Sequence, residues 1–196
     1  MTRKLITLAG CDASGKSSMH RRLSSDPLFT NALFVKEPYY AHNIALIKQC
    51  DDALKLIELF AKDREQLYNE VIIPDKRDLI ISDRSMICNF VYQSLAIEDQ
   101  YGWTTLEAID YIERHQPPTL WIDHVIFTKA DPTTLTARCQ KRNEKMTTQY
   151  ATMIQSRYEM ILEMFNYPYT IINTDQHNLD NSTYIASRVI EQVIGE

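Results

Sequence analysis

The segment GCDASGKS, residues 10–17, constrains the fold more than any other part of the chain. It places two of the four glycines, Gly10 and Gly15, close together and follows them with Lys16 and Ser17. The apolar run KLITLA before it is typical of a buried strand, and the residues from Ser17 onward are typical of a helix. A G-x-x-x-x-G-K-S spacing between a strand and a helix is the context in which a glycine-rich turn holds phosphate groups.

Each part of this loop can contribute to phosphate binding in its own way. A glycine-rich turn lets backbone N–H groups converge on phosphate oxygens, and the helix N-terminus adds positive partial charge. Lys16 can reach the β- and γ-phosphates, and Ser17 can ligate magnesium. The segment therefore predicts a bound nucleoside triphosphate; the alternative is a chance match in a strand-turn-helix unit.

The rest of the chain alternates strand-like runs with longer amphipathic stretches. Strands are expected over residues 4–9, 33–36, 78–82, 125–128 and 169–172. Helices are expected over residues 17–24, 51–72, 86–96, 104–114, 131–143, 146–166 and 181–194. This alternation predicts a single α/β domain over residues 1–196, with three α/β/α layers and a five-stranded parallel sheet. Ligands of such sheets bind beyond the carboxyl ends of the strands.

Composition excludes several classes of protein. A formal charge of −5 over 196 residues argues against a general nucleic-acid binder. The four cysteines are scattered without a C-x-x-C pair, as in a reduced cytoplasmic protein, and the five histidines form no ligand pair. The N-terminal apolar run is too short for a signal peptide or a membrane span. We therefore expect a cytoplasmic protein that binds neither nucleic acid nor membrane.

Two segments add candidate residues beyond the loop. In FVKEPYY, Lys36, Glu37 and Pro38 follow the second expected strand; the alternative is a solvated charge pair on a loop. In LIELFAKDREQL, Phe60 and Arg64 share a helix face and could stack on a base and bond its edge. On those residues alone, a core phenylalanine beside a surface arginine is the favoured interpretation.

A third segment, DLIISDRSMICNFVYQ, puts Asp83 and Arg84 directly after the third expected strand. An aspartate at this point is suited to hold magnesium or its water shell, and the adjacent arginine can grip a second phosphate group. These residues predict a metal site and a phosphate site beside the first loop.

Taken together, these motifs resemble those of the thymidylate kinases, and the similarity runs over most of the chain. The family loop G-x-D-x-x-G-K-[ST]-[ST] is matched by residues 10–18, and its Arg-Glu-Pro by residues 36–38. Its L-F-A-x-x-R helix is matched by residues 59–64, and its Asp-Arg segment by residues 81–93. Four motifs in the right order make the resemblance specific.

The resemblance implies a role for each matching position. Phe60 would stack on thymine, Arg64 would bond its edge, and Tyr92 would lie by the sugar or base. The implied ATP-binding residues are Gly10, Asp12, Ala13, Ser14, Gly15, Lys16, Ser17, Ser18 and Arg138. The implied substrate-binding residues are Asp12, Lys36, Glu37, Pro38, Phe60, Arg64, Arg84, Cys88, Asn89 and Tyr92. Ser17 and Asp83 would bind Mg²⁺.

Small kinases of this type close a basic lid over the phosphates. In ARCQKRNEKMTTQY, four cations, Arg138, Lys141, Arg142 and Lys145, recur at helical spacing, so we expect a helical lid over roughly residues 138–150. The alternative is a solvated basic face. Lys16, Arg84, Asp12 and Arg142 are the expected catalytic residues.

The chain also departs from the family pattern. Ser85 stands where the family has tyrosine, Cys88 replaces its pocket serine, and Lys36 replaces an arginine that can bind phosphate with two parallel bonds. A viral or otherwise divergent enzyme that accepts a modified pyrimidine monophosphate, or several deoxynucleotides, fits these changes.

The function expected from the sequence is transfer of the γ-phosphoryl group of ATP to dTMP or a related monophosphate. A deoxynucleoside kinase is the main rival, because a 5′-hydroxyl needs a base and Glu37 could serve. A non-catalytic nucleotide-binding protein is a third possibility. The family is usually a homodimer, for which the helices over 51–72 and 86–96 could supply an apolar face.

Overall fold

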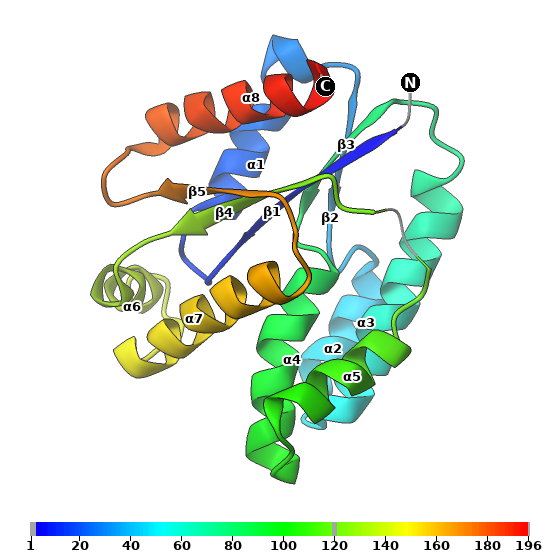
Figure 1. Cartoon of the computed structure of the whole chain (residues 1–196), viewed down its shortest axis with the longest axis vertical. Coiled ribbons are helices and arrows are strands. Elements are labelled where there is room, and N and C mark those ends of the chain that lie inside the picture. Colours follow the sequence, from blue (N-terminus) through cyan, green and yellow to red (C-terminus); the bar gives the residue numbers. More distant parts are fainter. Residues whose placement is uncertain (1–2, 119–120, 196) are drawn as a thin grey trace.

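The computed structural model of the chain describes residues 3–118 and 121–195. Five parallel strands form one sheet in the order β2-β3-β1-β4-β5, which puts β1 at its centre (Figure 1). The strands are β1 (Lys4–Gly10), β2 (Ala32–Lys36), β3 (Leu79–Asp83), β4 (His124–Lys129) and β5 (Tyr169–Asn173). The five-stranded parallel sheet that the sequence predicts is therefore confirmed.

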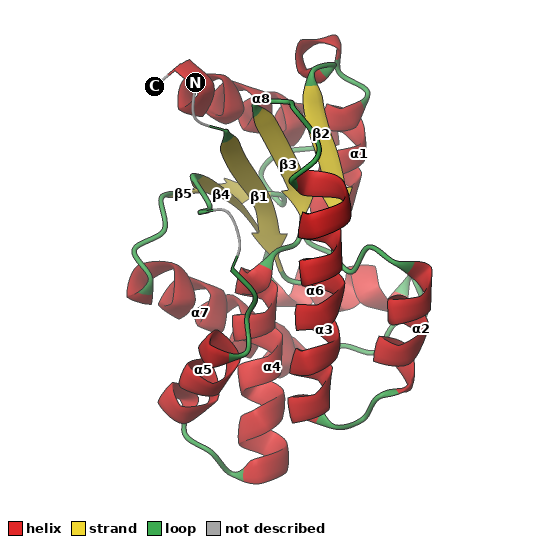
Figure 2. Ribbon diagram, turned by 90° about the vertical axis from the view of Figure 1, so that its right-hand side faces the viewer, coloured by secondary structure: helices red, strands yellow, loops and turns green. Residues whose placement is uncertain are grey.

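Helices cover both faces of this sheet, as Figures 1 and 2 show. The helices are α1 (Lys16–Ser24), α2 (Ala41–Gln49), α3 (Ala53–Leu67), α4 (Met86–Tyr101), α5 (Thr105–Arg114), α6 (Pro132–Gln140), α7 (Thr148–Met164) and α8 (Leu179–Gly195). One face packs on α1 and α8, and the other faces α4 and α7. The three-layer α/β/α arrangement follows.

The alternation of side chains along β1 explains why two separate cores form. Ile6 and Leu8 belong to the core that includes Met19 of α1 and Ile190 of α8. Leu5 and Ala9 belong to the larger core on the opposite face. Successive residues of a strand point to opposite faces, so a central strand covered on both sides needs a continuous apolar run.

The helices differ from the expected ones most clearly around α2, α3 and α4. The sequence reasoning missed α2, which follows Tyr40. The single helix expected over residues 51–72 is α3 followed by a π-helical turn, Tyr68–Ile72. Helix α4 continues beyond the expected residue 96 to Tyr101, where Gly102 ends it with a left-handed φ of 68°. A left-handed residue after the last turn is a common way to terminate a helix, and glycine adopts it without steric cost.

The expected lid, residues 138–150, comprises the end of α6, a connecting loop and the start of α7. Helix α6 ends at Gln140 rather than residue 143, and Asn143 has a left-handed φ of 56°. The Thr147 side chain then accepts a hydrogen bond from the Tyr150 N–H and so caps α7. None of the helices within residues 3–118 and 121–195 is long and apolar enough to cross a membrane.

Candidate active site

The loop after β1 takes its shape from contact with β4. A Cβ atom at Gly10 would lie 2.4 Å from the Thr128 carbonyl oxygen, so only glycine fits at this position. Ser14 is buried, and its Oγ lies 2.6 Å from the Thr128 Oγ1. The Thr128 hydroxyl in turn donates to the carbonyl oxygen of Ala9. Gly10 and Ser14, two of the expected ATP-binding residues, thus build the loop and line none of the three cavities described below.

Lys16 opens α1 and is almost completely enclosed. Its Nζ donates to the Cys11 carbonyl oxygen at 3.1 Å and lies 3.5 Å from Asp12 Oδ1. Burial, together with repulsion from Arg84, lowers the pKa of Lys16, whereas Asp12 acts in the opposite direction. An anionic phosphate in the loop would therefore stabilise the charged form of the lysine.

Arg84 lies between the loop and the start of α4. Its φ of 81° is in the left-handed region, which a residue with a Cβ seldom adopts, and its N–H donates to the Leu8 carbonyl oxygen. Its Nη2 donates to Asp12 Oδ1 at 2.6 Å, and its guanidinium carbon lies 5.9 Å from the centre of the Tyr92 ring. Burial alone would raise the pKa of Asp12, but Arg84 and Lys16 outweigh it and hold this pKa below its usual value. Backbone strain at a cation of this kind is typical of functional sites.

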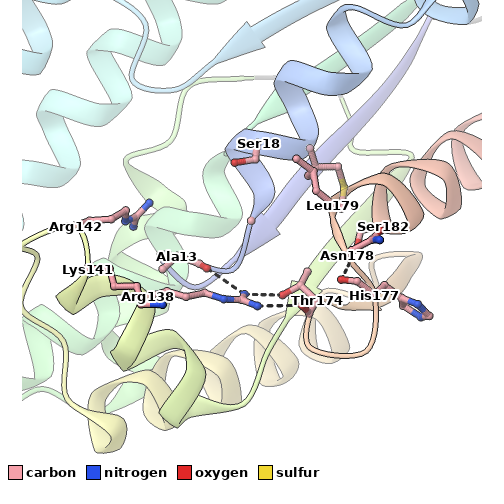
Figure 3. Close-up of a pocket in the computed structure, with 12 residues that line it drawn as sticks. Ala13, Ser18, Arg138, Lys141, Arg142, Thr174, His177, Asn178, Leu179 and Ser182 are labelled. Atoms are coloured by element: carbon pink, nitrogen blue, oxygen red, sulfur yellow. Dashed lines mark hydrogen bonds between the residues drawn. The ribbon is translucent and has the colours of Figure 1, made fainter.

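Three adjoining cavities lie at this edge of the sheet. The first, the α8 cavity, has a volume of about 440 Å³ and lies between the loop, α6 and the start of α8 (Figure 3). The second, the central cavity, measures about 340 Å³ and lies over Lys16. The third, the α4 cavity, measures about 450 Å³ and lies between α2, α3 and α4. Ala13 lines both the first and the second, and Asp12 lines both the second and the third, so the central cavity lies between the other two.

Arg138 organises the α8 cavity. Figure 3 shows its guanidinium reaching from α6 to the loop and to the end of β5. Nη1 donates to Thr174 Oγ1 and Nη2 to the Thr174 carbonyl oxygen, both at 3.0 Å, and Nη1 also contacts the Ala13 carbonyl oxygen at 3.4 Å. The cavity continues past Thr174 along His177 and Leu179. A planar guanidinium beside a partly apolar wall can pack against a flat ring.

Four cations line the central cavity: Lys16, Lys36, Arg84 and Arg142. Arg142 comes from the expected lid, and its Nη2 lies 2.6 Å from Glu144, which lines the same cavity. Cations brought to one cavity from the loop, β2, β3 and the lid have the charge needed to hold more than one phosphate group.

Asp83 and Ser17, the expected metal ligands, suit a hard cation. Asp83 is buried, and neither of its carboxylate oxygens has a hydrogen-bond partner among the residues the structure describes. The Lys36 Nζ lies 3.7 Å from Asp83 Oδ2. Ser17 lines the central cavity, and its hydroxyl is an oxygen ligand of the kind Mg²⁺ prefers. A buried carboxylate that forms no hydrogen bond is suited to a hard cation, but Asp83 is paired with Lys36 and lines none of the three cavities.

Most of the expected substrate-binding residues meet at the α4 cavity. The lining includes Asp12, Lys36, Glu37, Pro38, Phe60, Arg84, Cys88, Asn89 and Tyr92. Arg64 is the exception. It is buried, and its Nε and Nη2 donate to Glu37 Oε2 at 3.0 and 2.6 Å, while its Nη1 donates to Gln116. The structure thus places Phe60 at the cavity but engages Arg64 elsewhere, unlike the role that the resemblance implies.

Asp63, the neighbour of Arg64, holds the loop between β2 and α2. Its carboxylate accepts hydrogen bonds from the Tyr39 and Tyr40 N–H groups and from Asn43 Nδ2, at 2.7 to 3.0 Å. Asp63 and Arg64 therefore fix the Glu37 side of the cavity from α3. A buried carboxylate that accepts several hydrogen bonds is satisfied without a metal or ligand.

Sequence reasoning missed several residues that line these cavities. Ile44, Ile47 and Lys48 come from the unexpected helix α2, and Gln93 lies one turn after Asn89. The residues missed at the α8 cavity include Thr174, His177, Asn178, Leu179 and Ser182, around the loop before α8 and its first turn. The three-residue spacing of Ile44 and Ile47 is only a weak helical signal, and the loop after β5 carries no motif.

Comparison with known proteins agrees with this geometry. A family model described as thymidylate kinase matches residues 8–185, which is most of the chain. The chain belongs to the thymidylate kinase family. Thymidylate kinases are ATP-dependent nucleoside monophosphate kinases, and the chain is an enzyme of this class.

Two relatives and two solved structures show how far the similarity extends. A probable thymidylate kinase of Methanococcoides burtonii is 30% identical over 186 residues and 90% of each chain. A thymidylate kinase of Aliarcobacter butzleri is 29% identical over 178 residues, 86% of this chain and 89% of the other. The thymidylate kinase structure from Candida albicans has a TM-score of 0.77 at 19% identity, covering 97% of this chain and 92% of that one. The one from Ehrlichia chaffeensis has a TM-score of 0.65 at 16% identity, covering 97% and 100%.

Proposed function

We propose that the protein transfers the γ-phosphoryl group of ATP to a phosphate oxygen of dTMP. The observation that carries this proposal is the central cavity, where Lys16, Lys36, Arg84 and Arg142 converge between two larger cavities. The α8 cavity would hold the adenosine of ATP and the α4 cavity the deoxynucleoside. The phosphates of both nucleotides would then meet over Lys16.

The reaction needs positioning and charge neutralisation more than proton transfer. The second pKa of a phosphate monoester is about 6, so the acceptor is largely dianionic near pH 7 and needs no general base. Lys16 would hold the β- and γ-phosphates of ATP, and Arg84 would hold the acceptor phosphate with Lys36. Arg142 would leave Glu144 and neutralise the charge that develops on the transferred group.

Mg²⁺ would be held by Ser17 and by Asp83, directly or through water. When bound, the ion would offset the negative charge of the ATP phosphates. Both carboxylate oxygens of Asp83 lack a hydrogen-bond donor among the described residues, which supports this assignment. Lys36, 3.7 Å from the same carboxylate, would turn toward the acceptor phosphate when the ion binds.

The rival activity on a 5′-hydroxyl would require Glu37 as base. In the structure Glu37 Oε2 receives two hydrogen bonds from Arg64, which supports a role in fixing the loop after β2. A dTMP acceptor, which needs no base, is consistent with this arrangement.

A direct assay tests the proposal. The protein is incubated with Mg-ATP and, separately, dTMP, dUMP, dCMP, dAMP, dGMP or thymidine, and ADP release is measured. We expect turnover with dTMP that stops when EDTA removes the metal. ADP release with thymidine but not dTMP would instead establish the nucleoside kinase, and no release with any acceptor would favour a non-catalytic role.

We further propose a homodimer in the cytoplasm. The four free cysteines are typical of a reducing compartment. The dimer face was expected on the helix over residues 51–72 or on the one over residues 86–96. Most apolar side chains of α4 are already buried against α3, α5 and α7, so α3 is the better candidate for the dimer face. Light scattering should give twice the 22.9 kDa chain mass; a value equal to the chain mass would refute the dimer.

A further inference from the structure

Three sulfur atoms meet where the loop after β1 touches the expected lid. Met146, in the segment between α6 and α7, places its Sδ 3.9 Å from Cys11 Sγ and 3.8 Å from Cys139 Sγ. Cys11 belongs to the loop and Cys139 to α6, and both are buried. The three side chains come from separate places in the chain, and no step of the proposed reaction uses them.

The spacing of these sulfur atoms suits a metal ion held by three of them. Metal–thiolate bonds are about 2.3 Å long, so three sulfur atoms at about 120° around one ion lie about 4 Å from one another. The two distances from Met146 Sδ are close to this value. Each thiol now donates a weak hydrogen bond to the thioether. An ion that replaced the two thiol protons would therefore need little movement of the sulfur atoms.

The donor set determines which ion fits. Thiolate and thioether sulfur are soft ligands, which select Cu(I) and similar ions over hard ions such as Mg²⁺. Structural zinc sites take four ligands. Within residues 3–118 and 121–195, no group of three or more histidine, cysteine, aspartate or glutamate side chains could hold a metal ion. Two thiols and a thioether therefore favour a soft monovalent ion over zinc.

Two cations beside the cluster would offset the charge of the thiolates. Burial is the largest effect on both thiols; it raises the pKa of Cys11 to about 12 and also raises the pKa of Cys139. Lys16 acts in the opposite direction on the pKa of Cys11, and Arg142 does so on the pKa of Cys139. A thiol that coordinates a metal is deprotonated outright. The two cations are thus placed to stabilise the complex, in which two thiolates exceed one monovalent ion by a single negative charge.

We propose that Cys11, Cys139 and Met146 form a site for one soft monovalent cation, such as Cu(I). The ion forms two bonds to thiolate sulfur and one to the thioether, and the two thiol protons pass to solvent. Arg142 lies in the chain between Cys139 and Met146, so an ion bound to both holds it beside Glu144. Because the proposed reaction needs Arg142 to leave Glu144, the bound ion inhibits phosphoryl transfer. Inhibition rests on the proposed function, whereas binding of the ion does not.

A copper titration tests the site. The reduced protein is titrated with Cu(I) in competition with bathocuproine disulfonate, whose absorbance reports the copper that the chelator still holds. The wild type should take up one Cu(I) per chain, and its ADP release should fall in proportion to the copper bound. Met146→Leu keeps the side-chain volume but removes one ligand, so it should weaken binding at least about 10-fold. Cys139→Ser should weaken it further, because it removes a thiolate.

Matched controls separate the site from the other sulfur atoms of the chain. Met160, like Met146, is partly buried and packs against the larger core. Cys50 is a free, half-buried cysteine outside the cluster. Met160→Leu and Cys50→Ser should both bind Cu(I) as the wild type does.

Two results would overturn the site. Affinities of Met146→Leu and Cys139→Ser within about twofold of the wild type would show that copper is held elsewhere. Should both variants fail to fold, X-ray absorption of the copper-loaded wild type decides: three sulfur neighbours support the site, and nitrogen, oxygen or only two sulfur neighbours refute it.

The consequence for activity can fail separately. Copper bound at the cluster without loss of ADP release would refute the restraint on Arg142. Copper-free wild type that phosphorylates dTMP keeps the proposed function whatever copper does. A protein that binds copper as described but is inactive on every monophosphate without it would lose the proposed function and keep the site.

Discussion

Lys16 shows how a single buried cation can be held ready for a ligand. Its ammonium group has a backbone carbonyl at 3.1 Å and a carboxylate at 3.5 Å, and Arg84 lies close enough to oppose its charge. These contacts hold the side chain over the loop, but they do not fully offset the effect of burial, which lowers the pKa of Lys16. Phosphate binding would supply the missing negative charge.

We expect Lys16→Met to remove activity without unfolding the domain. Loss of one preorganised contact to the transferred group lowers kcat by about 10²- to 10³-fold, and removing a buried cation should not lower the unfolding temperature. ADP release and thermal unfolding measure the two effects. Turnover near the wild-type rate would contradict the role given to Lys16. Loss of the cooperative unfolding transition would show that the domain needs Lys16 to fold.

The cysteines provide a prediction about chemical reactivity. Burial, with a smaller contribution from Asp12, raises the pKa of Cys11 to about 12, and burial also raises the pKa of Cys139. Cys50 is only half-buried. Because the thiolate is the reactive form, iodoacetamide at pH 8 should modify Cys50 first and leave Cys11 and Cys139 intact.

Peptide mass spectrometry of the native protein checks this order, and labelling in urea should reach all four cysteines. Cys50→Ser should remove the fast reaction. Early modification of Cys11 would mean that the loop opens far more readily than its packing suggests.

Phe60 and Arg64 show what the sequence could and could not predict about single residues. Their four-residue spacing correctly indicated one helix, and Phe60 does line the cavity. The partners of Arg64, however, lie 27 and 52 residues away in the chain. Such long-range pairing depends on the packing of α3 against the β2 loop and the end of α5, and no local pattern contains it.

At the scale of elements, α2 was missed because little of it is fixed by its own sequence pattern. Only Asn43 of its nine residues is buried, so the apolar periodicity is weak. The helix is positioned from outside by Asp63, which bonds the two residues before it and Asn43 itself. In contrast, β1 and β3 have continuous apolar runs because both faces are covered, and these strands were predicted nearly to the residue.

Two glycines at helix ends permit a matched test of backbone geometry. A Cβ atom would meet nothing within 4 Å at Gly102 or at Gly195, but only Gly102 has a left-handed φ, of 68°. Gly102→Ala should therefore cost about 1 kcal/mol of unfolding free energy, through conformation alone. Gly195→Ala should change it by less than about 0.5 kcal/mol at the frayed end of α8.

Urea denaturation of the two variants and the wild type measures the difference. Equal stability of both variants would show that the end of α4 can adopt another conformation at no cost. That result would also mean that the left-handed conformation of Gly102 is not what ends α4.

For the whole molecule, the key question is whether two nucleotides bind at once. We expect a non-hydrolysable ATP analogue and dTMP each to raise the unfolding temperature. At one hundred times its Kd, each ligand adds about 2.7 kcal/mol, and the two together should stabilise the protein more than either alone, since the α8 and α4 cavities are lined by different residues.

Differential scanning calorimetry with neither, one or both ligands gives this comparison. If saturation with the ATP analogue abolished the shift caused by dTMP, the two would be competing for one pocket. Binding of a second ATP analogue in place of dTMP would appear as a biphasic concentration dependence.

The overall architecture was the most predictable level of all. Alternating apolar runs and amphipathic stretches require crossover connections, and a parallel sheet covered on both faces follows from them. The three cavities were not predictable in shape, because they depend on where α2, α6 and the loop before α8 come to rest. The residues that line them were partly foreseen, since strand ends at one edge of a sheet bring their loops together.

The order of the strands places the α8 cavity and the α4 cavity over different parts of the sheet edge. Everything around the α8 cavity follows β1, β4 and β5, while the segments specific to the α4 cavity follow β2 and β3. Mutation can therefore reshape one half of the sheet edge while leaving the other half alone. Substitutions around the α4 cavity can therefore change the preferred acceptor during evolution while ATP remains the phosphate donor.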